Sequence, residues 1–414
     1  MIVPKLRFSE FKGKWFKKKI GDFIVNHVGG ASFTPNDFVK ESNFEVIPKK
    51  AIMSGGKLIL DKENPTFSSE DFYQNNLKNT IDKSYLVTTL RDLVPSGPSI
   101  GYIVSFDDDK KYILAQGVYG FRIKDDLNRN FLIQFSNTSK FRTIMQSKMV
   151  GSTQVHIRNQ DYFDTEIYKP CLEEQTKIAE FLSAVDDKIS QLSRQLELLN
   201  QYKKGVMQKI FSQEIRFKND NGEDFGEWEE VPLNQIASKV TVKNRGNKVT
   251  EVLTNSATQG IIKQSDFFDR EIVSESNING YYVVEVDDFV YNPRISVHAP
   301  VGPIKRNKIT QGIMSPLYTV FRFKEGNLDF LSYFFGTNFW HDYVKSVANS
   351  GARHDRMNIT NSDFLEMPIL LPSIQEQEKI AEFLTAIDKR IDHTTAQLTH
   401  TKQWKKGLLQ QMFV

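Results

Sequence analysis

The sequence contains an internal repeat, and this repeat constrains the fold more than any other feature. Residues 170–186 read PCLEEQTKIAEFLSAVD, and residues 372–388 read PSIQEQEKIAEFLTAID. The match continues without insertions to Phe211 in the first copy and Phe413 in the second. Similarity this long shows that the chain consists of two homologous halves in tandem. In each half a variable segment precedes a nearly constant one.

The two constant segments have the pattern of coiled-coil helices. Apolar residues recur at alternating intervals of three and four from Ile178 to Ile210, with one interruption at Lys203. The second copy holds the same phase from Ile380 to Met412. A proline precedes each segment and glutamates occupy the first turn, as is common at helix starts. We predict helices over residues 171–212 and 372–414.

The connectivity predicts how these helices pair. The first helix leads from one variable segment to the next, so the second helix must run back along it. We expect an antiparallel coiled coil with pseudo-twofold symmetry between the halves and a globular domain at each end.

The variable segments, residues 1–170 and 213–371, are predicted to be two α/β (α+β) domains. The segments with strand-like composition are residues 101–106, 117–123, 281–291 and 317–323, and the segments with helical spacing are residues 131–149 and 330–343.

The composition limits the kind of partner and the location. Aromatic residues make up 12% of the 414 residues, enough for more than one core. The 54 basic residues nearly balance the 51 acidic ones, so nucleic-acid binding would require basic residues concentrated locally. The single cysteine excludes an internal disulfide. With no signal-peptide pattern and no apolar run of about 20 residues, we expect a cytoplasmic protein without membrane segments.

Motifs for catalysis are not evident in the sequence. A DNA methyltransferase would need a glycine-rich loop for S-adenosylmethionine and an Asn/Asp-Pro-Pro-Tyr/Phe element. Asn292-Pro293-Arg294 approaches that element but has no second proline. There is no phosphate-binding Gly-x4-Gly-Lys-Ser/Thr motif, and the histidines show no metal-ligand spacing. We therefore expect no catalytic, cofactor or metal site in this chain.

Loops that suit DNA contacts recur instead at comparable distances from each long helix. Arginine can hold guanine with two hydrogen bonds, asparagine and glutamine can hold adenine, and hydroxyl groups can hold phosphate. We predict DNA contacts from Thr88, Thr89, Arg91, Ser152, Gln154, His156 and Arg158 in the first half, and from Asn292, Arg294, Ser296, Arg353, His354 and Arg356 in the second.

The chain resembles the specificity (S) subunit of type I restriction–modification systems over essentially its whole length. The resemblance rests on the repeated Pro-x-x-x-Glu-Gln-x-Lys-Ile-Ala-Glu-Phe-Leu at residues 170–182 and 372–384. It also rests on Asp-Asp-Phe-Val-Tyr-Asn-Pro-Arg at residues 287–294, followed by Gly-Pro-Ile at 302–304. The first half departs from this second motif, with Thr-Thr-Leu-Arg at residues 88–91.

The resemblance implies a function and a set of partners. An S subunit is not catalytic, and each of its two target-recognition domains reads one half of an asymmetric bipartite site in double-stranded DNA. Two methyltransferase (M) subunits, which use S-adenosylmethionine, and restriction (R) subunits, which use ATP and Mg²⁺, assemble on it.

The faithful repetition of residues outside the coiled-coil seam suggests where M subunits dock. We predict two equivalent docking surfaces that include Glu174, Gln175, Lys177, Glu376, Gln377 and Lys379.

Two alternatives from other classes stay open at this point. One is an adenine-N6 methyltransferase with a degenerate catalytic half. The other is a coiled-coil adaptor that never contacts DNA.

Overall fold

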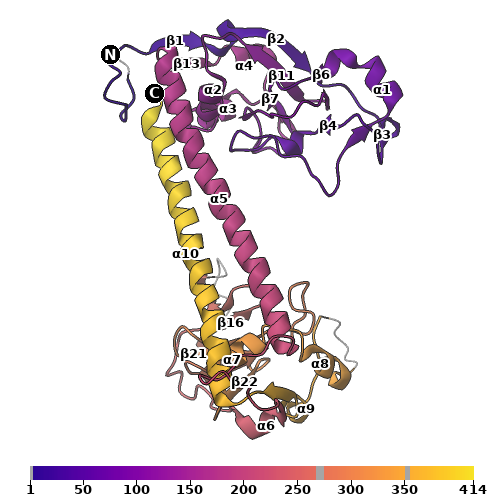
Figure 1. The fold of residues 1–414 in the computed structure, drawn as a ribbon, viewed down its shortest axis with the longest axis vertical. Helices are drawn as coiled ribbons and strands as arrows, with labels where there is room; N and C mark the ends of the chain where they lie inside the picture. Colours follow the sequence, from indigo (N-terminus) through magenta and orange to yellow (C-terminus); the bar gives the residue numbers. More distant parts are fainter. Residues whose placement is uncertain (1–2, 267–274, 350–354) are drawn as a thin grey trace. The chain divides into compact units, whose positions relative to one another are not determined.

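The computed structural model describes residues 3–266, 275–349 and 355–414. The chain forms two compact units: unit 1 is Met1–Arg194 with Thr395–Val414, and unit 2 is Gln195–Thr394. Both ends of the chain therefore belong to unit 1 (Figure 1). The unit boundaries cut both long helices, so each unit holds one globular segment, the beginning of one long helix and the end of the other.

Unit 1 is a mixed α/β body around an antiparallel four-stranded sheet with the order β2-β11-β7-β9. Its strands are β1 (Phe16–Lys19), β2 (Ile24–Gly29), β3 (Phe38–Val39), β4 (Val46–Ile47), β5 (Phe67–Ser68), β6 (Thr80–Ile81), β7 (Leu86–Thr89), β8 (Arg91–Asp92), β9 (Ile103–Val104), β10 (Tyr112–Leu114), β11 (Val118–Ile123), β12 (Val155–His156) and β13 (Glu166–Lys169). Its α-helices are α1 (Glu70–Asn75), α2 (Arg129–Ser136), α3 (Ser139–Lys148), α4 (Asn159–Phe163) and the first part of α5 (Leu172–Phe211).

Unit 2 repeats this plan around an antiparallel sheet with the order β15-β22-β19-β20. Its strands are β14 (Glu229–Pro232), β15 (Ala237–Lys239), β16 (Leu253–Ser256), β17 (Gly260–Lys263), β18 (Tyr282–Val284), β19 (Phe289–Tyr291), β20 (Ile304–Arg306), β21 (Gly312–Met314), β22 (Thr319–Phe323) and β23 (Pro368–Leu371). Its α-helices are α6 (Leu233–Ile236), α7 (Leu328–Phe334), α8 (His341–Val347), α9 (Asn361–Leu365) and the first part of α10 (Ile374–Met412).

The expected strand over residues 281–291 is wrong in one respect, because the structure divides it into β18 and β19. The chain turns between them at Asp287, which has a φ of 74°. The next residue, Asp288, is fully buried and accepts hydrogen bonds from Arg322 at 2.6 and 3.0 Å. The buried Asp288 carboxylate, paired with the half-exposed Arg322, thus lies at the turn that interrupts the strand.

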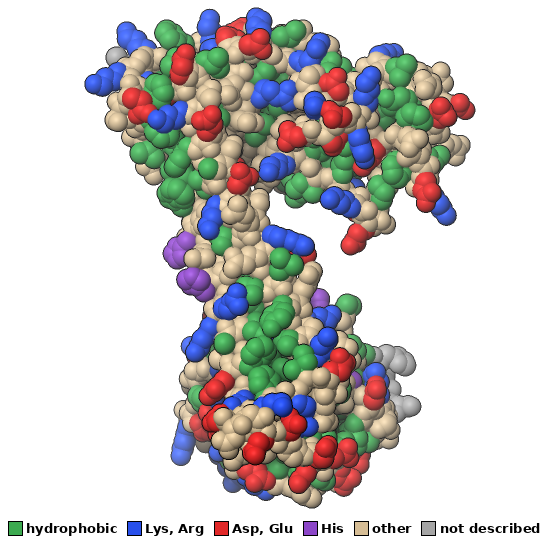
Figure 2. Space-filling view, in the orientation of Figure 1, with side chains coloured by type: hydrophobic (Ala, Val, Ile, Leu, Met, Phe, Trp, Pro, Cys, Tyr) green, Lys and Arg blue, Asp and Glu red, His purple; other side chains and the backbone are tan. Residues whose placement is uncertain are grey.

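Among the described residues, no helix is both long enough and apolar enough to cross a bilayer. On the face of unit 1 that Figure 2 shows, basic and acidic side chains are interspersed rather than segregated. This face of unit 1 therefore presents no large surface of one charge (Figure 2).

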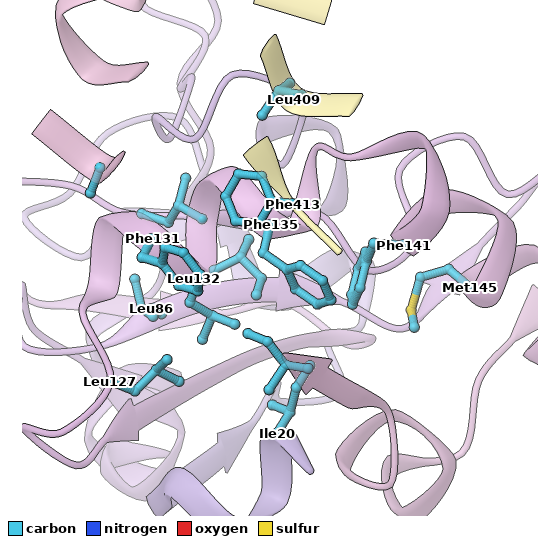
Figure 3. Packing of buried hydrophobic residues seen from close by; sticks show 14 of the residues in the cluster. Ile20, Leu86, Leu127, Phe131, Leu132, Phe135, Phe141, Met145, Leu409 and Phe413 are labelled. Atoms are coloured by element: carbon cyan, nitrogen blue, oxygen red, sulfur yellow. The ribbon is translucent and has the colours of Figure 1, made fainter. Parts of the chain in front are cut away.

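The ends of the long helices are part of the domain cores. In unit 1, Phe413 at the end of α10 lies 5.0 Å from Phe131 and 6.1 Å from Phe135 between ring centroids (Figure 3). Ile178 and Leu182 near the start of α5 belong to the same core. Within unit 1 the two long helices are therefore antiparallel, as predicted.

Unit 2 has the same arrangement with the helices exchanged. Phe211 at the end of α5 lies 5.4 Å from Phe330 and 6.0 Å from Phe334, in a core shared with Ile380 and Leu384 of α10. The antiparallel pairing is thus confirmed within each unit.

The interruption of the heptad pattern at Lys203 has a structural reason. Lys203 of α5 forms an ion pair with Asp388 of α10 in unit 2. At the equivalent place in unit 1, Lys405 of α10 pairs with Asp186 of α5. The lysine stem packs in the helix interface while its charge is neutralised by the opposite helix.

A buried carboxylate in the first turn of each long helix joins that helix to the segment before the domain. In unit 1, Glu174 is 1% exposed and accepts two hydrogen bonds from Arg7, both at 2.7 Å, and one from the indole of Trp15 at 3.3 Å. This hydrogen bonding raises the pKa of the Arg7 guanidinium. Three hydrogen-bond donors therefore surround the buried carboxylate.

Unit 2 contains the same anchor. Glu376, with no exposed surface, accepts hydrogen bonds from Arg216 at 2.7 and 2.8 Å and from Trp228 at 3.1 Å. The neighbouring Gln377 donates to the carbonyl of Pro372 at 2.9 Å and accepts from the backbone of Asn327 at 2.9 Å. Gln175 makes the equivalent bonds in unit 1.

These contacts correct the predicted docking surface for M subunits. Glu174, Gln175, Glu376 and Gln377 are buried rather than solvent-facing. Their repetition is explained by bonds within each unit. Lys177 and Lys379 are partly exposed, and each pairs with an acidic residue of its own unit, Glu10 and Asp220 respectively.

We predict that Glu376→Gln lowers the free energy of unfolding by about 3 kcal/mol, because it leaves the charge of Arg216 without its partner in a buried place. The matched control is Glu378→Gln, which changes an exposed glutamate of the same helix turn. Urea unfolding followed by circular dichroism measures both variants. Equal unfolding free energies for the two would show that the anchor does not stabilise the fold.

Candidate nucleic-acid interface

In unit 1, five of the predicted DNA-contacting residues lie in or next to the short ladder between β8 and β12. Arg91 in β8 lies opposite His156 in β12, and the backbone N–H of Ile157 donates to the carbonyl of Leu90 at 2.9 Å. The side chains of Arg91 and His156 are both exposed. The ladder therefore presents two adjacent hydrogen-bonding side chains to solvent.

A tight turn extends this ladder. Gly151 has a φ of 117°, and a Cβ at this position would lie 2.1 Å from the carbonyl oxygen of Gln154. Glycine is therefore required for the turn to close. The turn leaves Ser152 and Gln154 exposed, and Arg158 is exposed just before α4. Loop side chains on a rigid backbone of this kind suit recognition of a surface.

Unit 2 builds a similar bridge from different residues. The backbone of Arg294, after β19, forms an isolated antiparallel β-bridge with the backbone of Arg356. The backbone N–H of Met357 donates to the carbonyl of Pro293 at 2.9 Å. The Arg294 side chain is 67% exposed and that of Arg356 is 27% exposed. The carboxylate of Asp355 lies 3.7 Å from the Nε atom of each arginine. One acidic residue thus orients two basic ones.

The loop from Asn292 to Gly302 carries Arg294 and is fixed at both ends. Gly302 has a φ of 83°, and a Cβ there would lie 2.1 Å from the Asn292 carbonyl oxygen. The Asn292 side chain donates to the carbonyl of Asn255 at 3.0 Å and accepts from the backbone of Arg294 at 3.0 Å. Asn292 therefore positions the loop, because its amide is already used within the unit.

The tip of this loop contains the predicted residue Ser296 and, beside it, two residues that were not predicted, Val297 and His298. Ser296 is exposed, but its Oγ accepts a hydrogen bond from the backbone N–H of Ala299 at 3.2 Å. Val297 is 95% exposed, and His298 beside it is also exposed. No periodicity or motif marks Val297 in the sequence. Its apolar side chain could contact a thymine methyl group in a DNA groove.

A cavity of about 460 Å³ lies beside the bridge of unit 2. Arg356, Asn358, Lys239 and Tyr318 are among the residues in its wall. The Nε of Arg356 is buried and makes no hydrogen bond. An arginine in a cavity wall presents guanidinium donors that suit a ligand with acceptor atoms.

Two predicted contacts are wrong, and two others cannot be placed. Thr88 and Thr89 are 1% and 0% exposed, because both lie in the central strand β7, so they cannot contact DNA in this conformation. The Thr89 hydroxyl donates to the carbonyl of Gly117 at 2.9 Å. Arg353 and His354 lie outside the described residues.

The described residues contain no group of three or more His, Cys, Asp or Glu side chains that could hold a metal ion. The candidate interface consists of two backbone bridges, one in each unit. Arg91 lies opposite His156 in unit 1, and Arg294 lies opposite Arg356 in unit 2. The backbone plan is the same and the side chains differ. This combination defines a class of protein with two homologous, non-identical recognition domains.

Comparison with known families identifies the class more closely. The family model for the type I restriction modification DNA specificity domain matches residues 12–201 and 226–401. The chain belongs to this family and is a specificity subunit of a type I restriction–modification system, the DNA-recognition subunit of such systems.

Two curated relatives come from Methanocaldococcus jannaschii. The type I restriction enzyme MjaVIII specificity subunit is 26% identical over 316 residues, which cover 72% of this chain and 73% of the relative. The putative type I restriction enzyme MjaX specificity subunit is 28% identical over 252 residues, which cover 58% of this chain and 56% of the relative.

Solved structures share the fold at low sequence identity. The S subunit of a type I restriction–modification system from M. genitalium has a TM-score of 0.59 and 15% identity, covering 100% of this chain and 99% of that one. A chain from a study of complex assembly and conformational transition of the type I system has a TM-score of 0.53 and 14% identity, covering 98% of both chains. The predicted fold class is therefore confirmed.

We predict that Arg294→Ala relaxes sequence preference in one half of the recognition site and leaves the other half unchanged. Loss of one base contact made by two hydrogen bonds should weaken binding by about 1–3 kcal/mol. Arg91→Ala is the reciprocal control, because it should relax the other half. Sequencing of N6-methyladenine in cells that express each variant with its methyltransferase partner measures both. Relaxation of the same half by both variants would contradict a separate reading role for each unit.

Proposed function

We propose that this chain is the non-catalytic subunit that reads an asymmetric bipartite site in double-stranded DNA, one half with each unit. The observation that carries the proposal is the pair of backbone bridges with different exposed side chains. Equivalent backbones place Arg91 and His156 in one unit and Arg294 and Arg356 in the other. Two scaffolds with different reading side chains suit a site whose halves differ in sequence.

The element most similar to a methyltransferase motif has a structural role, which supports a recognition function without catalysis. Asn292 would have to contact a flipped base, yet both its amide nitrogen and its amide oxygen are hydrogen-bonded within the unit. We propose that S-adenosylmethionine binds in a methyltransferase subunit, and that ATP and Mg²⁺ act in a restriction subunit. The assembly would then work in the cytoplasm, where bacterial and archaeal DNA is located.

Two binding measurements test the proposed recognition function: retention of duplex DNA by the complex, and binding of S-adenosylmethionine by the chain alone. The chain purified with its methyltransferase partner should retain duplex DNA at low salt, and the partner alone should not methylate at a defined site. Saturable binding of S-adenosylmethionine by the chain alone would favour the degenerate methyltransferase. Failure of the complex to retain any DNA would favour the coiled-coil adaptor.

We also propose that each unit docks one methyltransferase subunit, so that two assemble on each chain. Exposed apolar residues at equivalent positions of the two units support this. They are Leu6, Leu172 and Trp404 in unit 1, and Ile215, Ile374 and Tyr202 in unit 2, and each side chain is between 39% and 53% exposed. Apolar side chains that are exposed in both copies are suited to a partner surface.

We predict that Ile374→Lys reduces the complex from two methyltransferase subunits to one, because a charge would have to be buried at one docking surface only. Native mass spectrometry of the copurified complex measures the ratio. Leu198→Lys is the control, because Leu198 is 48% exposed and its equivalent in the repeat, His400, is not apolar. One methyltransferase subunit on the unaltered chain would refute the proposal.

The two long helices are proposed to set the unread spacer between the half-sites. α5 and α10, of 40 and 39 residues, each pass from one unit into the other as a single helix. The number of residues in each helix is therefore the quantity that we propose sets the spacer. A change in both helices by a whole heptad preserves the packing pattern.

We predict that one heptad inserted after both Ser193 and Thr395 lengthens the preferred spacer by about three base pairs. Seven helical residues add about 10 Å, and DNA rises about 3.4 Å per base pair. The half-sites should stay the same, because no loop of the candidate interface is changed. Sequencing of the methylated motif measures the spacer.

The control is the same insertion in α5 alone, which should abolish activity because it shifts the antiparallel packing. An unchanged spacer with normal activity in the double-insertion variant would show that the helices do not measure the distance.

A further inference from the structure

Unit 2 contains a basic pocket that the reading of base edges does not explain. Its volume is about 580 Å³, and its wall is formed by α5, by the end of the Asn292–Gly302 loop, by β20 and by the segment around Trp340. Three lysines line it: Lys203, Lys204 and Lys305. No aspartate or glutamate is among its described lining residues.

Among these lysines, Lys305 combines partial burial with the lack of a described carboxylate partner. Its side chain extends from the edge strand β20 and is partly buried. No described carboxylate forms an ion pair with it, whereas Lys203 in the same wall is paired with Asp388. Burial lowers the pKa of Lys305, and the charge of Lys203 lowers it further. An anion in the pocket would offset both the burial of the Lys305 charge and its repulsion by Lys203.

The wall also contains an unused hydrogen-bond donor. Trp340 is 2% exposed, and its indole Nε1–H is buried without a hydrogen-bond partner. Buried donors are nearly always paired in folded proteins, so an unpaired one calls for an acceptor. Two histidines, His298 and His341, and the polar residues Asn200, Gln208, Thr337 and Asn338 also line the wall.

Unit 1 shows that this chemistry is not needed by the fold. In the sheet of unit 1, β9 takes the place of β20, and Val104, which has no exposed surface, stands where unit 2 has Lys305. Phe141 follows Phe131 at the same interval at which Trp340 follows Phe330. The lysine amine and the indole N–H therefore belong to unit 2 alone.

We propose that this pocket binds a phosphate group. The proposal rests on the proposed function for its ligand, a phosphate of the DNA backbone next to the half-site that unit 2 reads. His298 and Gly302 in the pocket wall belong to the loop that carries Arg294. A phosphate held there would fix the duplex relative to Arg294 without reading sequence. The same chemistry would also accept the phosphate of a free nucleotide, which the experiment distinguishes.

The first measurement is the salt dependence of duplex binding by the full-length chain with its methyltransferase partner. Lys305→Val should reduce the slope of log affinity against log salt by about 0.9, equally for matched and mismatched duplexes. Lys305→Arg should restore the slope. Trp340→Phe should weaken all duplexes about fivefold, through the loss of one hydrogen bond. Val and Phe are the residues that unit 1 uses at these places, so both variants should fold.

The control variant is Lys324→Val, an exposed lysine after β22, where the backbone bonds to Ile236 of α6. It should leave the slope unchanged. The second measurement is acetylation of Lys305, followed by mass spectrometry, with duplex DNA, inorganic phosphate or adenosine monophosphate present. Protection by duplex DNA identifies the backbone as the source. Protection by the mononucleotide but not by duplex identifies a free nucleotide.

An unchanged slope in Lys305→Val, with no protection by any of the three probes, would overturn the phosphate site. That result leaves the proposed function intact if the complex still methylates its defined motif. Loss of all site-specific methylation in the unaltered protein would instead count against the proposed function.

Discussion

The buried carboxylate in the first turn of each long helix is the interaction on which the rest of the structure depends. Glu174 and Glu376 each accept hydrogen bonds from one arginine and one tryptophan that lie far away in sequence. A buried ion pair stabilises a fold only when its geometry is good and its remaining hydrogen bonds are satisfied. Both conditions hold here. The anchors fix the beginning of each helix to its domain, and the aromatic ends of the opposite helices complete the same cores.

The two units keep these interior contacts and differ where a ligand can reach them. The anchors, the lysine–aspartate pairs between helices and the terminal phenylalanines are repeated. The side chains of the bridges and of the pocket of unit 2 are not repeated, since His156 is matched by an arginine and Val104 by Lys305. A fold whose stability lies in repeated contacts is free to change its exposed loops. This is the requirement for a protein that reads two different half-sites.

The helices could be predicted from the sequence almost completely, because their heptad pattern is local. The expected ranges 171–212 and 372–414 agree within two residues with α5 and α10. The strands are harder to predict, since a turn at Asp287, next to the buried Asp288 carboxylate, divides an otherwise strand-like segment. Site residues with local signals are exposed, such as Arg91 in β8 and Arg294 after β19. Thr88 and Thr89 are buried because β7 is a central strand, a position that depends on neighbours distant in sequence.

The roles of the repeated polar residues depended on contacts that sequence spacing does not show. Glu174 bonds to Arg7 across 167 residues, so its repetition looked like a conserved surface although it is interior. The sequence does contain a signal for this interior contact, because Arg7 and Trp15 recur as Arg216 and Trp228. Val297 and Lys305 have no such signal, because an exposed loop tip and a pocket wall are properties of the folded chain.

Sequencing of N6-methyladenine in cells that carry this unaltered chain with its methyltransferase partner tests the central claim, that each unit reads one half of a divided site. The account predicts two short specified blocks of different sequence, separated by a spacer of constant length and unspecified sequence. A single continuous motif, or methylation at adenines without a shared motif, would contradict it.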